Sequence, residues 1–433
     1  MNVRNRFTRF LSASSSVKYL LIALALAVVA ALGLGAFYLF RPPAAPSQPS
    51  LTASPGPFPT VSPEPSAVAS PSAASPRGAE PSAGEVRLVL PLVMRSGSPA
   101  SVASQPPGTA TPAPPTATPT PPPTDFEAVR RELQAEGKDL AHVKIGFHLG
   151  PGGNARGLGE YLRGLADAGV PAVVKSVDAY GVLAEALQAS PDHVTVFRLS
   201  GGDLELPNYD LPPEVAAEEH WTRILAALPP EFDQRTWLEV MNEPDKGRAD
   251  WLGRCAHRLA ELALRDGYRL AAFGWSSGEP EPDHWQTPGM RAFLSLAAQH
   301  PDRIAVALHE YSYSVGDIAR QYPSLLGRFQ TLFRICDQLG LERPTVLITE
   351  WGWESEFVPP VGQAMEDIAW ASELYAAYPQ VRGAAIWYLG PGYGDIANQA
   401  QRLIVPLRYY AWSEYFVIEP GQKPTDPSQF GPD

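Results

Sequence analysis

The sequence predicts an α/β protein built around a (β/α)8 TIM barrel, preceded by a transmembrane helix and a disordered Pro/Ser/Thr-rich linker. From residue 143 onward, apolar runs of strand length alternate with amphipathic stretches of helical spacing, the pattern of parallel strands joined by helices. Two of these runs deliver a glutamate at their C-terminal ends. Before residue 125, an uncharged run of 22 residues is followed by a tract that holds about half of the chain's 47 prolines.

Residues 1–18 form a basic segment, with three arginines and one lysine but no acidic residue. Residues 19–40 carry no charge, and at roughly 1.5 Å per residue a helix of this length just spans a ~30 Å hydrocarbon core. Because a basic flank stays in the cytoplasm, we expect an uncleaved signal anchor in the cell membrane, with the rest of the chain outside. A cleaved signal peptide, which would leave the protein secreted, is the alternative, although its apolar region is usually only about 7–15 residues long.

Residues 41–124 should be a disordered linker, because a tract of Pro, Ser, Thr and Ala buries too little apolar surface to offset chain entropy. Residues 125–433 fit one barrel domain. The first 124 residues hold eight basic and three acidic side chains, so the remainder has 26 basic and 43 acidic ones, a net charge of −17. Such a charge argues against nucleic acid or anionic lipid as a partner of the domain.

Eight strand-like runs can be counted in this domain, which is the number that closes a barrel. An open, doubly wound sheet of similar size is the structural alternative. The runs are Val143–Leu149, Pro171–Val177, His193–Leu199, Thr236–Met241, Tyr268–Phe273, Ile304–His309, Thr345–Thr349 and Val381–Trp387. Helical spacing is clearest in Leu158–Ala168, Val215–Leu228, Trp251–Leu264, Met290–Gln299, Leu325–Leu339 and Ala364–Tyr378, and a last helix within 397–412 is weakly marked. The only cysteines, Cys255 and Cys336, fall in two different helices, and we expect buried free thiols.

Two short motifs suggest other chemistry. Residues 150–155 (GPGGNA) match the loose dinucleotide fingerprint G-x-G-x-x-A after a strand, which would imply a cofactor-dependent oxidoreductase. Residues 274–278 (GWSSG) match the G-x-S-x-G motif of α/β-hydrolases. That motif must enter a helix directly, yet the sequence EPEP follows here, and no histidine occurs after His309 to complete a triad. We regard both matches as weak.

The motifs WLEVMNEP (237–244) and VLITEWGW (346–353) carry the two strand-terminal glutamates, Glu243 and Glu350. They resemble the signature strands of the clan A glycoside hydrolases, the "4/7" retaining enzymes with a cellulase-like (β/α)8 barrel. The resemblance covers 143–390 at the level of strand order, and its specific matches are confined to a few short motifs. It implies that Glu243, on the fourth strand, is the general acid/base and that Glu350, on the seventh, is the nucleophile.

Retaining hydrolysis requires two carboxyl groups about 5–5.5 Å apart, one ionised and one protonated. Glu350 must stay ionised, so it needs hydrogen-bond donors and positive charge, for which Arg198 and Tyr311 are the candidates. The family more often places its arginine one strand earlier. Glu243 must hold a proton, and we expect the negative charge of Glu350 and partial desolvation to raise its pKa.

The remaining candidate site residues bind substrate. By resemblance, Asn242 holds the sugar 2-hydroxyl, and the family pattern H-x-Y matches His309 and Tyr311, whose alternation places Glu310 on the opposite side of the strand. Trp387, at the end of the eighth strand, matches the aromatic floor under the cleaved sugar. Four further tryptophans near predicted loop ends are candidates for additional subsites: Trp275, Trp285, Trp351 and Trp353.

The sequence therefore predicts a membrane-anchored glycoside hydrolase that acts outside the cell on an oligo- or polysaccharide through a covalent glycosyl-enzyme intermediate. We expect no metal and no organic cofactor. A non-catalytic carbohydrate-binding or adhesion barrel is the main alternative.

Overall fold

The computed structural model describes residues 123–421. The predicted cytoplasmic segment, the predicted membrane anchor and nearly all of the predicted linker lie outside these described residues, so they stay predictions. Between residues 123 and 421, none of the helices is long and apolar enough to cross a membrane.

Eight parallel strands form a closed barrel in the order in which they occur in the chain. The first and last strands pair in parallel, with Gly146 opposite Ala385, which closes the cylinder and excludes the open sheet. The barrel strands are β2 (Ile145–Leu149), β3 (Val173–Val177), β4 (Val194–Arg198), β5 (Trp237–Glu239), β6 (Arg269–Trp275), β7 (Ile304–Tyr311), β8 (Thr345–Gly352) and β9 (Val381–Ile386). The predicted (β/α)8 barrel is thus confirmed, with β5 as its fourth strand and β8 as its seventh.

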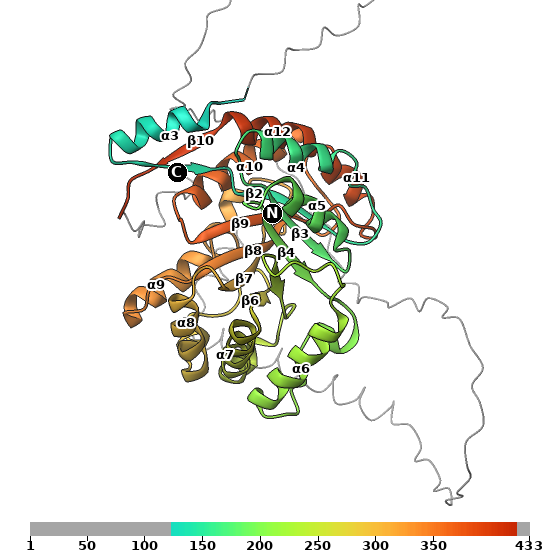
Figure 1. The fold of residues 1–433 in the computed structure, drawn as a ribbon, viewed down its shortest axis with the longest axis vertical. Coiled ribbons are helices and arrows are strands. Elements are labelled where there is room, and N and C mark those ends of the chain that lie inside the picture. Colours follow the sequence, from blue (N-terminus) through green and yellow to red (C-terminus); the bar gives the residue numbers. More distant parts are fainter. Residues whose placement is uncertain (1–122, 422–433) are drawn as a thin grey trace, which may run out of the picture. The chain divides into compact units, whose positions relative to one another are not determined.

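Helices follow each strand and surround the barrel (Figure 1). They are α4 (Leu158–Asp167), α5 (Gly181–Ala189), α6 (Pro213–Ala227), α7 (Ala249–Asp266), α8 (Pro288–Gln299), α9 (Phe329–Leu339), α10 (Val361–Ala376), α11 (Ile396–Gln401) and α12 (Ile404–Ser413). The weakly marked last helix is therefore two consecutive helices. Four short 3-10 turns interrupt the loops after β4, β5, β6 and β7, which all belong to the C-terminal face of the barrel: Gly202–Leu204, Lys246–Arg248, His284–Gln286 and Ile318–Gln321.

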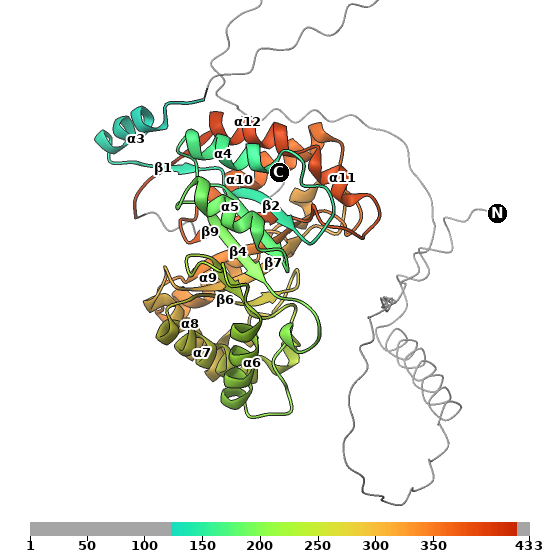
Figure 2. The ribbon, with the colours of Figure 1, turned by 45° about the vertical axis from the view of Figure 1, so that its right-hand side comes forward.

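A small antiparallel sheet lies at the opposite end of the barrel and was not predicted. Strand β1 (Asp139–His142) leads into β2 after two residues and pairs with β10 (Tyr415–Ile418). Helix α3 (Phe126–Ala135) precedes β1 and lies beside it (Figure 2), with the Phe126 ring 4.9 Å from the His142 ring. Both strands are four residues long and only partly buried, so their hydrophobic pattern is too short to indicate a strand.

Two apolar layers build the core. The larger layer fills the space between the strands and the surrounding helices. The smaller one lies inside the barrel and consists of Val196, Trp237, Ala271, Ala305, Ala307 and Leu347. One step further toward the C-terminal ends of the same strands, the inward-facing side chains become polar, with Arg198, Glu239 and His309 following in register. The barrel interior is therefore apolar below and charged above, which positions the polar groups at one mouth.

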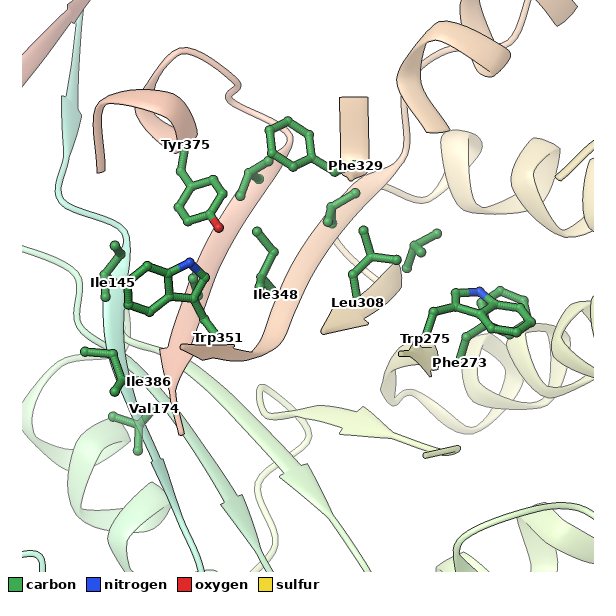
Figure 3. Packing of buried hydrophobic residues seen from close by; sticks show 14 of the residues in the cluster. Ile145, Val174, Phe273, Trp275, Leu308, Phe329, Ile348, Trp351, Tyr375 and Ile386 are labelled. Carbon is green, nitrogen blue, oxygen red and sulfur yellow. The ribbon is translucent and has the colours of Figure 1, made fainter. Parts of the chain in front are cut away.

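A β-bulge in β8 determines which side chains face that mouth. Leu308 and His309 are consecutive on β7, but their partners on β8 are Ile348 and Glu350, so β8 has one extra residue. Such a bulge re-aims the side chains that follow it. As a result, Thr349 and Glu350 both contact groups inside the barrel, while Trp351 packs outside it, beside Tyr375 (Figure 3).

Candidate active site

Glu350 is a buried carboxylate at the C-terminal mouth of the barrel. The Tyr311 hydroxyl donates to its Oε2 at 2.7 Å, and the Lys175 ammonium donates to its Oε1 at 3.1 Å. Arg198 Nη2 and His148 Nδ1 lie further from Oε1, at 3.8 and 3.9 Å. The Glu350 residue is 5% exposed, so its charge is held by protein groups rather than by water.

A second buried carboxylate, Glu239, lies behind Glu350. Its Oε2 is 2.6 Å from Lys175 Nζ and 3.8 Å from Arg198 Nε, and its Oε1 accepts a hydrogen bond from Thr349 at 2.6 Å. Lys175 therefore bridges two carboxylates at the centre of the barrel. This bridge offsets the large desolvation penalty of each buried charge.

His309 connects the two predicted catalytic carboxylates. Its Nδ1 lies 3.0 Å from Glu243 Oε1 and 3.6 Å from Glu350 Oε2. Because one atom is shared, the sum of these two distances, about 6.6 Å, is the largest possible separation of those two oxygens. The other ring nitrogen faces Glu239 Oε1 at 3.8 Å. The barrel thus brings Glu243 and Glu350 to the same mouth and within reach of one small molecule.

Glu243 lies at the rim of the mouth rather than inside it. Its side chain is 44% exposed, and its backbone adopts φ 46°. The Glu243 amide donates to Gly274 O at 2.9 Å, and the Ser276 hydroxyl donates to its Oε1 at 3.0 Å. A left-handed backbone at a non-glycine residue requires support from its surroundings, and the strand end of β6 supplies that support here.

The pKa values of the buried carboxylates Glu350 and Glu239 are lowered, whereas the pKa of the neighbouring Tyr311 is raised. Burial would raise the pKa of Glu350, but the charges of His309, Lys175, His148 and Arg198 together hold it well below its ordinary value. Burial would likewise raise the pKa of Glu239, and Lys175 outweighs it, so this pKa is also lowered. The pKa of Tyr311 is raised well above 10 by burial and by Glu350, so its hydroxyl keeps its proton and donates it.

The prediction that the pKa of Glu243 is raised is wrong. The hydrogen bond from His309 lowers the pKa of Glu243, and this effect exceeds both its partial desolvation and the repulsion from Glu350. Burial alone would lower the pKa of His309, but Glu350, Glu239 and Glu243 raise it. Without a ligand, the lowered pKa favours the ionised form of Glu243, and the raised pKa favours the protonated form of His309.

The two carboxylates open into one pocket of about 350 Å³. Its lining combines charged and aromatic side chains: Arg198, Glu205, Asn242, Glu243, Tyr311, Tyr313, Glu350, Ser355, Trp387 and Tyr393. The Asn242 Oδ1 is buried and has no hydrogen-bond partner within residues 123–421. This free acceptor and the aromatic rings fit a polar ligand whose ring faces are apolar.

Six of the seven predicted site residues line this pocket, namely Arg198, Asn242, Glu243, Tyr311, Glu350 and Trp387, and His309 lies directly behind it. Tyr311 was predicted to donate a hydrogen bond to Glu350, and its hydroxyl does so. Arg198, the other predicted donor, lies too far from Glu350 for a hydrogen bond. Glu310 points away from the site, as predicted, and accepts bonds from Gly327, Phe329 and Tyr375 in the helix layer.

Three functional positions were missed. Lys175 lies on β3, one strand before Arg198, where the resembled family more often has its arginine, and this departure was the available signal. Glu239 is inside the first motif, four residues before Glu243, and alternation along the strand would have pointed it inward. Ser276 is part of the hydrolase-like motif, and nothing in the sequence indicated its contact with Glu243. This contact depends on the fold of the loop after β6.

Other sequence candidates have structural roles. The four tryptophans proposed for further subsites are at most 1% exposed and belong to the core. In the dinucleotide-like loop, a Cβ on Gly153 would lie 2.0 Å from the carbonyl of Leu389. Because this glycine is required for packing against the loop after β9, its presence does not indicate a phosphate site.

No protein-family model and no curated protein matches the sequence. Solved structures with similar folds include a family 5 xyloglucanase from Paenibacillus pabuli, 13% identical over 62% of this chain and 99% of its own, with a TM-score of 0.39. A family 26 endo-β-1,4-mannanase from Cellulomonas fimi is 12% identical over 65% and 74%, with a TM-score of 0.36. The YdjI aldolase from Escherichia coli K12 is 11% identical over 66% and 94%, with a TM-score of 0.30. Such distant likeness does not distinguish between barrel chemistries, so the function rests on the residues of the site.

Proposed function

We propose that the protein is a glycoside hydrolase that cleaves O-glycosidic bonds with retention, with Glu350 as nucleophile and Glu243 as acid/base. The observation that carries the proposal is the position of the two carboxylates. They lie on either side of one His309 nitrogen, at the open mouth of a closed barrel, and their environments differ in burial and charge. Pairs of carboxyl groups with different environments are the basis of acid/base assignment in glycosidases.

The separation of the carboxylates favours retention over inversion. Retaining enzymes hold the two groups about 5–5.5 Å apart, whereas inverting enzymes leave about 6.5–9.5 Å for a water molecule. The upper limit of about 6.6 Å between the two oxygens covers the first range and only the edge of the second.

In the first step, an ionised Glu350 oxygen forms a bond to the anomeric carbon while the glycosidic oxygen leaves. Lys175 and Tyr311 keep Glu350 ionised and fix its orientation, which reduces the reorganisation needed in the transition state. The leaving oxygen takes a proton from Glu243. In the second step Glu243 accepts a proton from water, whose oxygen displaces Glu350 from the sugar.

The proton for the first step is stored between His309 and Glu243. A sugar ring that covers the exposed side of Glu243 would desolvate this carboxylate and raise its pKa. The proton can then pass from His309 Nδ1 to Glu243 across their 3.0 Å contact. His309 in this scheme is a proton-positioning residue, whereas Asn242 and Trp387 contact the sugar.

Trapping of the covalent intermediate tests the proposal. A panel of 2-deoxy-2-fluoro glycosides with dinitrophenolate leaving groups should add one fluorosugar to the wild-type chain, and peptide mass spectrometry should locate it on Glu350. Glu350→Gln should abolish the adduct. Glu160→Gln, an exposed change on the outer helix α4, is the matched control and should react normally.

The role of Glu243 is tested separately. Glu243→Ala should lower kcat on substrates with poor leaving groups by about 10²–10⁴-fold and much less on dinitrophenyl glycosides. Azide should restore turnover of the activated substrates and yield a glycosyl azide of unchanged anomeric configuration. A product of inverted configuration from the wild-type enzyme would contradict retention. Glycan binding with neither adduct nor turnover would instead support the non-catalytic carbohydrate-binding barrel.

We further propose that residues 19–40 anchor the enzyme in the cell membrane with the barrel outside. The support is the uncharged run of 22 residues and its basic flank. Protease treatment of intact cells should remove the barrel domain while leaving a membrane-bound N-terminal fragment. Recovery of the whole activity in the culture medium would favour cleavage and secretion.

A further inference from the structure

Three aromatic side chains on adjacent loops of the catalytic mouth are at least half exposed. They are Tyr313 after β7 (57%), Phe357 after β8 (54%) and Tyr393 after β9 (50%). Tyr313 and Tyr393 also line the pocket that holds the two carboxylates. Large apolar rings left in water do not stabilise the fold, and their gathering at one pocket indicates a binding surface.

The ring planes describe the shape of this surface. Tyr311 and Tyr313 are nearly parallel, with an interplanar angle of 22°. Both Tyr311 and Tyr393 stand nearly perpendicular to Trp387, at 80° and 75°. Tyr313 comes from the loop after β7 and Tyr393 from the loop after β9, on either side of β8. We call these two side chains the aromatic walls of the pocket and the Trp387 indole its floor.

The backbone of both wall residues is strained. Tyr313 has φ 51° and Tyr393 has φ 50°, in the left-handed region that bulky side chains rarely adopt. Tyr393 is flanked by Gly392 and Gly394, which have φ 81° and 61°, so three successive residues adopt this conformation. Strain of this kind persists mainly where it positions a functional side chain, and here it coincides with exposure at the same two residues.

The charge of the pocket restricts what can lie between the walls. Its lining residues include three carboxylates, Glu205, Glu243 and Glu350, and a single cation, Arg198. The Arg198 guanidinium is already shared between Glu239 and Glu350 at 3.8 Å. An anionic sugar would therefore meet repulsion that no free cation in the lining compensates.

We propose that Tyr313 and Tyr393 are specificity-determining residues that hold an uncharged, equatorially linked β-hexopyranoside chain over the Trp387 floor. This inference rests on the proposed glycosidase function and names its substrate class. A pyranose with only equatorial substituents presents axial hydrogens on both faces, so it can contact aromatic rings on either side. An axial hydroxyl or linkage lifts one face away from its wall, and a uronate adds the repelled charge.

Calorimetric titration of the full-length, inactive Glu350→Gln protein with three matched tetrasaccharides tests the proposal. The probes are cellotetraose, its C6-oxidised β-1,4-glucuronate counterpart, and β-1,4-galactotetraose with axial linkages. Cellotetraose should bind at least about tenfold more tightly than the other two. Adding Tyr313→Ala or Tyr393→Ala should each weaken cellotetraose binding by about threefold to tenfold, the range of one aromatic contact. Tyr415→Ala, which removes an exposed tyrosine at the opposite end of the barrel, should leave it unchanged.

The outcomes separate this inference from the proposed function. Equal affinity for cellotetraose with and without the two tyrosines, no binding of cellotetraose, or equal binding of the glucuronate would overturn the aromatic walls, even if the wild-type enzyme forms the Glu350 adduct. Tyrosine-dependent cellotetraose binding without any adduct would support the walls and refute hydrolysis. Thermal unfolding should show both alanine variants folded, because each removes a side chain that is at least half exposed.

Discussion

At the residue scale, the central feature is a lysine that serves two carboxylates. Lys175 Nζ lies 2.6 Å from Glu239 and 3.1 Å from Glu350, and its side chain is fully buried. Burial alone would favour protonated carboxyl groups. The ammonium group of Lys175 therefore stabilises the ionised form of Glu350, the proposed nucleophile.

Replacement of Lys175 by methionine should shift the acid limb of the kcat/KM profile to higher pH. The folded-state pKa of Glu350 is lowered, so its ionised form is present above that pKa and is lost as pH falls through it. Without Lys175 the pKa rises and the loss begins at a higher pH. We expect kcat/KM at neutral pH to fall by about tenfold or more, as measured with an activated aryl glycoside.

Lys138→Met is the matched control for this prediction, because Lys138 pairs with Glu136 at the surface. Its pH profile should equal that of the wild type. If Lys175→Met reduced activity without moving the acid limb, Lys175 would have a structural role only. Circular dichroism must accompany the assay, since two buried carboxylates lose their shared partner.

His309 shows why residue types alone did not predict the direction of the pKa shift of Glu243. The expected rise in the pKa of Glu243 considered Glu350 and desolvation but not the imidazole between them. The donor at 3.0 Å reverses the sign. Because two ionisable groups in contact titrate as a pair, the pKa shift of Glu243 depends on its distance from His309, which the sequence does not state.

At the element scale, two β-bulges shape the site. In β6 the extra residue is Gly274, where a Cβ would lie 2.8 Å from Glu239 Oε1. In β8 the extra residue is Thr349. If β8 continued through Thr349 as a regular strand, alternation from Leu347 would point Glu350 at the helices. Both bulges therefore act on the carboxylates. They turn Glu350 inward and make room for Glu239.

Glu310 links strand β7 to helix α9 and gives a pH-dependent contribution to stability. It is fully buried, and it accepts bonds from the Gly327 and Phe329 amides and the Tyr375 hydroxyl. Burial raises its pKa to about 7. Because the folded pKa exceeds the unfolded value of about 4.3, the folded state binds the proton more tightly, and stability falls as pH rises between these values.

Glu310→Gln should flatten this slope. The difference in the free energy of unfolding between pH 4.5 and 7 should become smaller than in the wild type by up to about 3 kcal/mol. Urea denaturation at a series of pH values measures it, and Glu160→Gln serves as control. An unchanged slope would mean that Glu310 is ionised throughout this range.

At the scale of the whole molecule, the two cysteines report on global unfolding. Cys255 and Cys336 are free and have no exposed surface. Burial raises the pKa of both thiols, that of Cys336 to about 12. The expectation of buried free thiols is confirmed, and neither α7 nor α9 offers a thiolate to an oxidant in the folded state.

Thiol reagents should therefore label the native protein only as fast as it unfolds. With dithionitrobenzoate at pH 8, we expect negligible reaction in buffer and two thiols per chain in 6 M guanidinium. Addition of a reductant should not change the thermal midpoint. Rapid labelling of either cysteine in buffer would show that its helix opens locally.

The sequence by itself determined an α/β fold with eight parallel strands, because buried strands that alternate with amphipathic helices pack as a sheet covered by those helices. The pairing of β2 with β9 decided that this sheet closes into a barrel. The sequence also located most of the site, since the C-terminal ends of parallel strands converge on one mouth. Only the tertiary structure decided the bridging role of Lys175, the inward turn of Glu350 at the β8 bulge and the opposite pKa shifts of His309 and Glu243. These depend on distances of a few ångströms between distant segments, and electrostatic energy changes steeply over such distances.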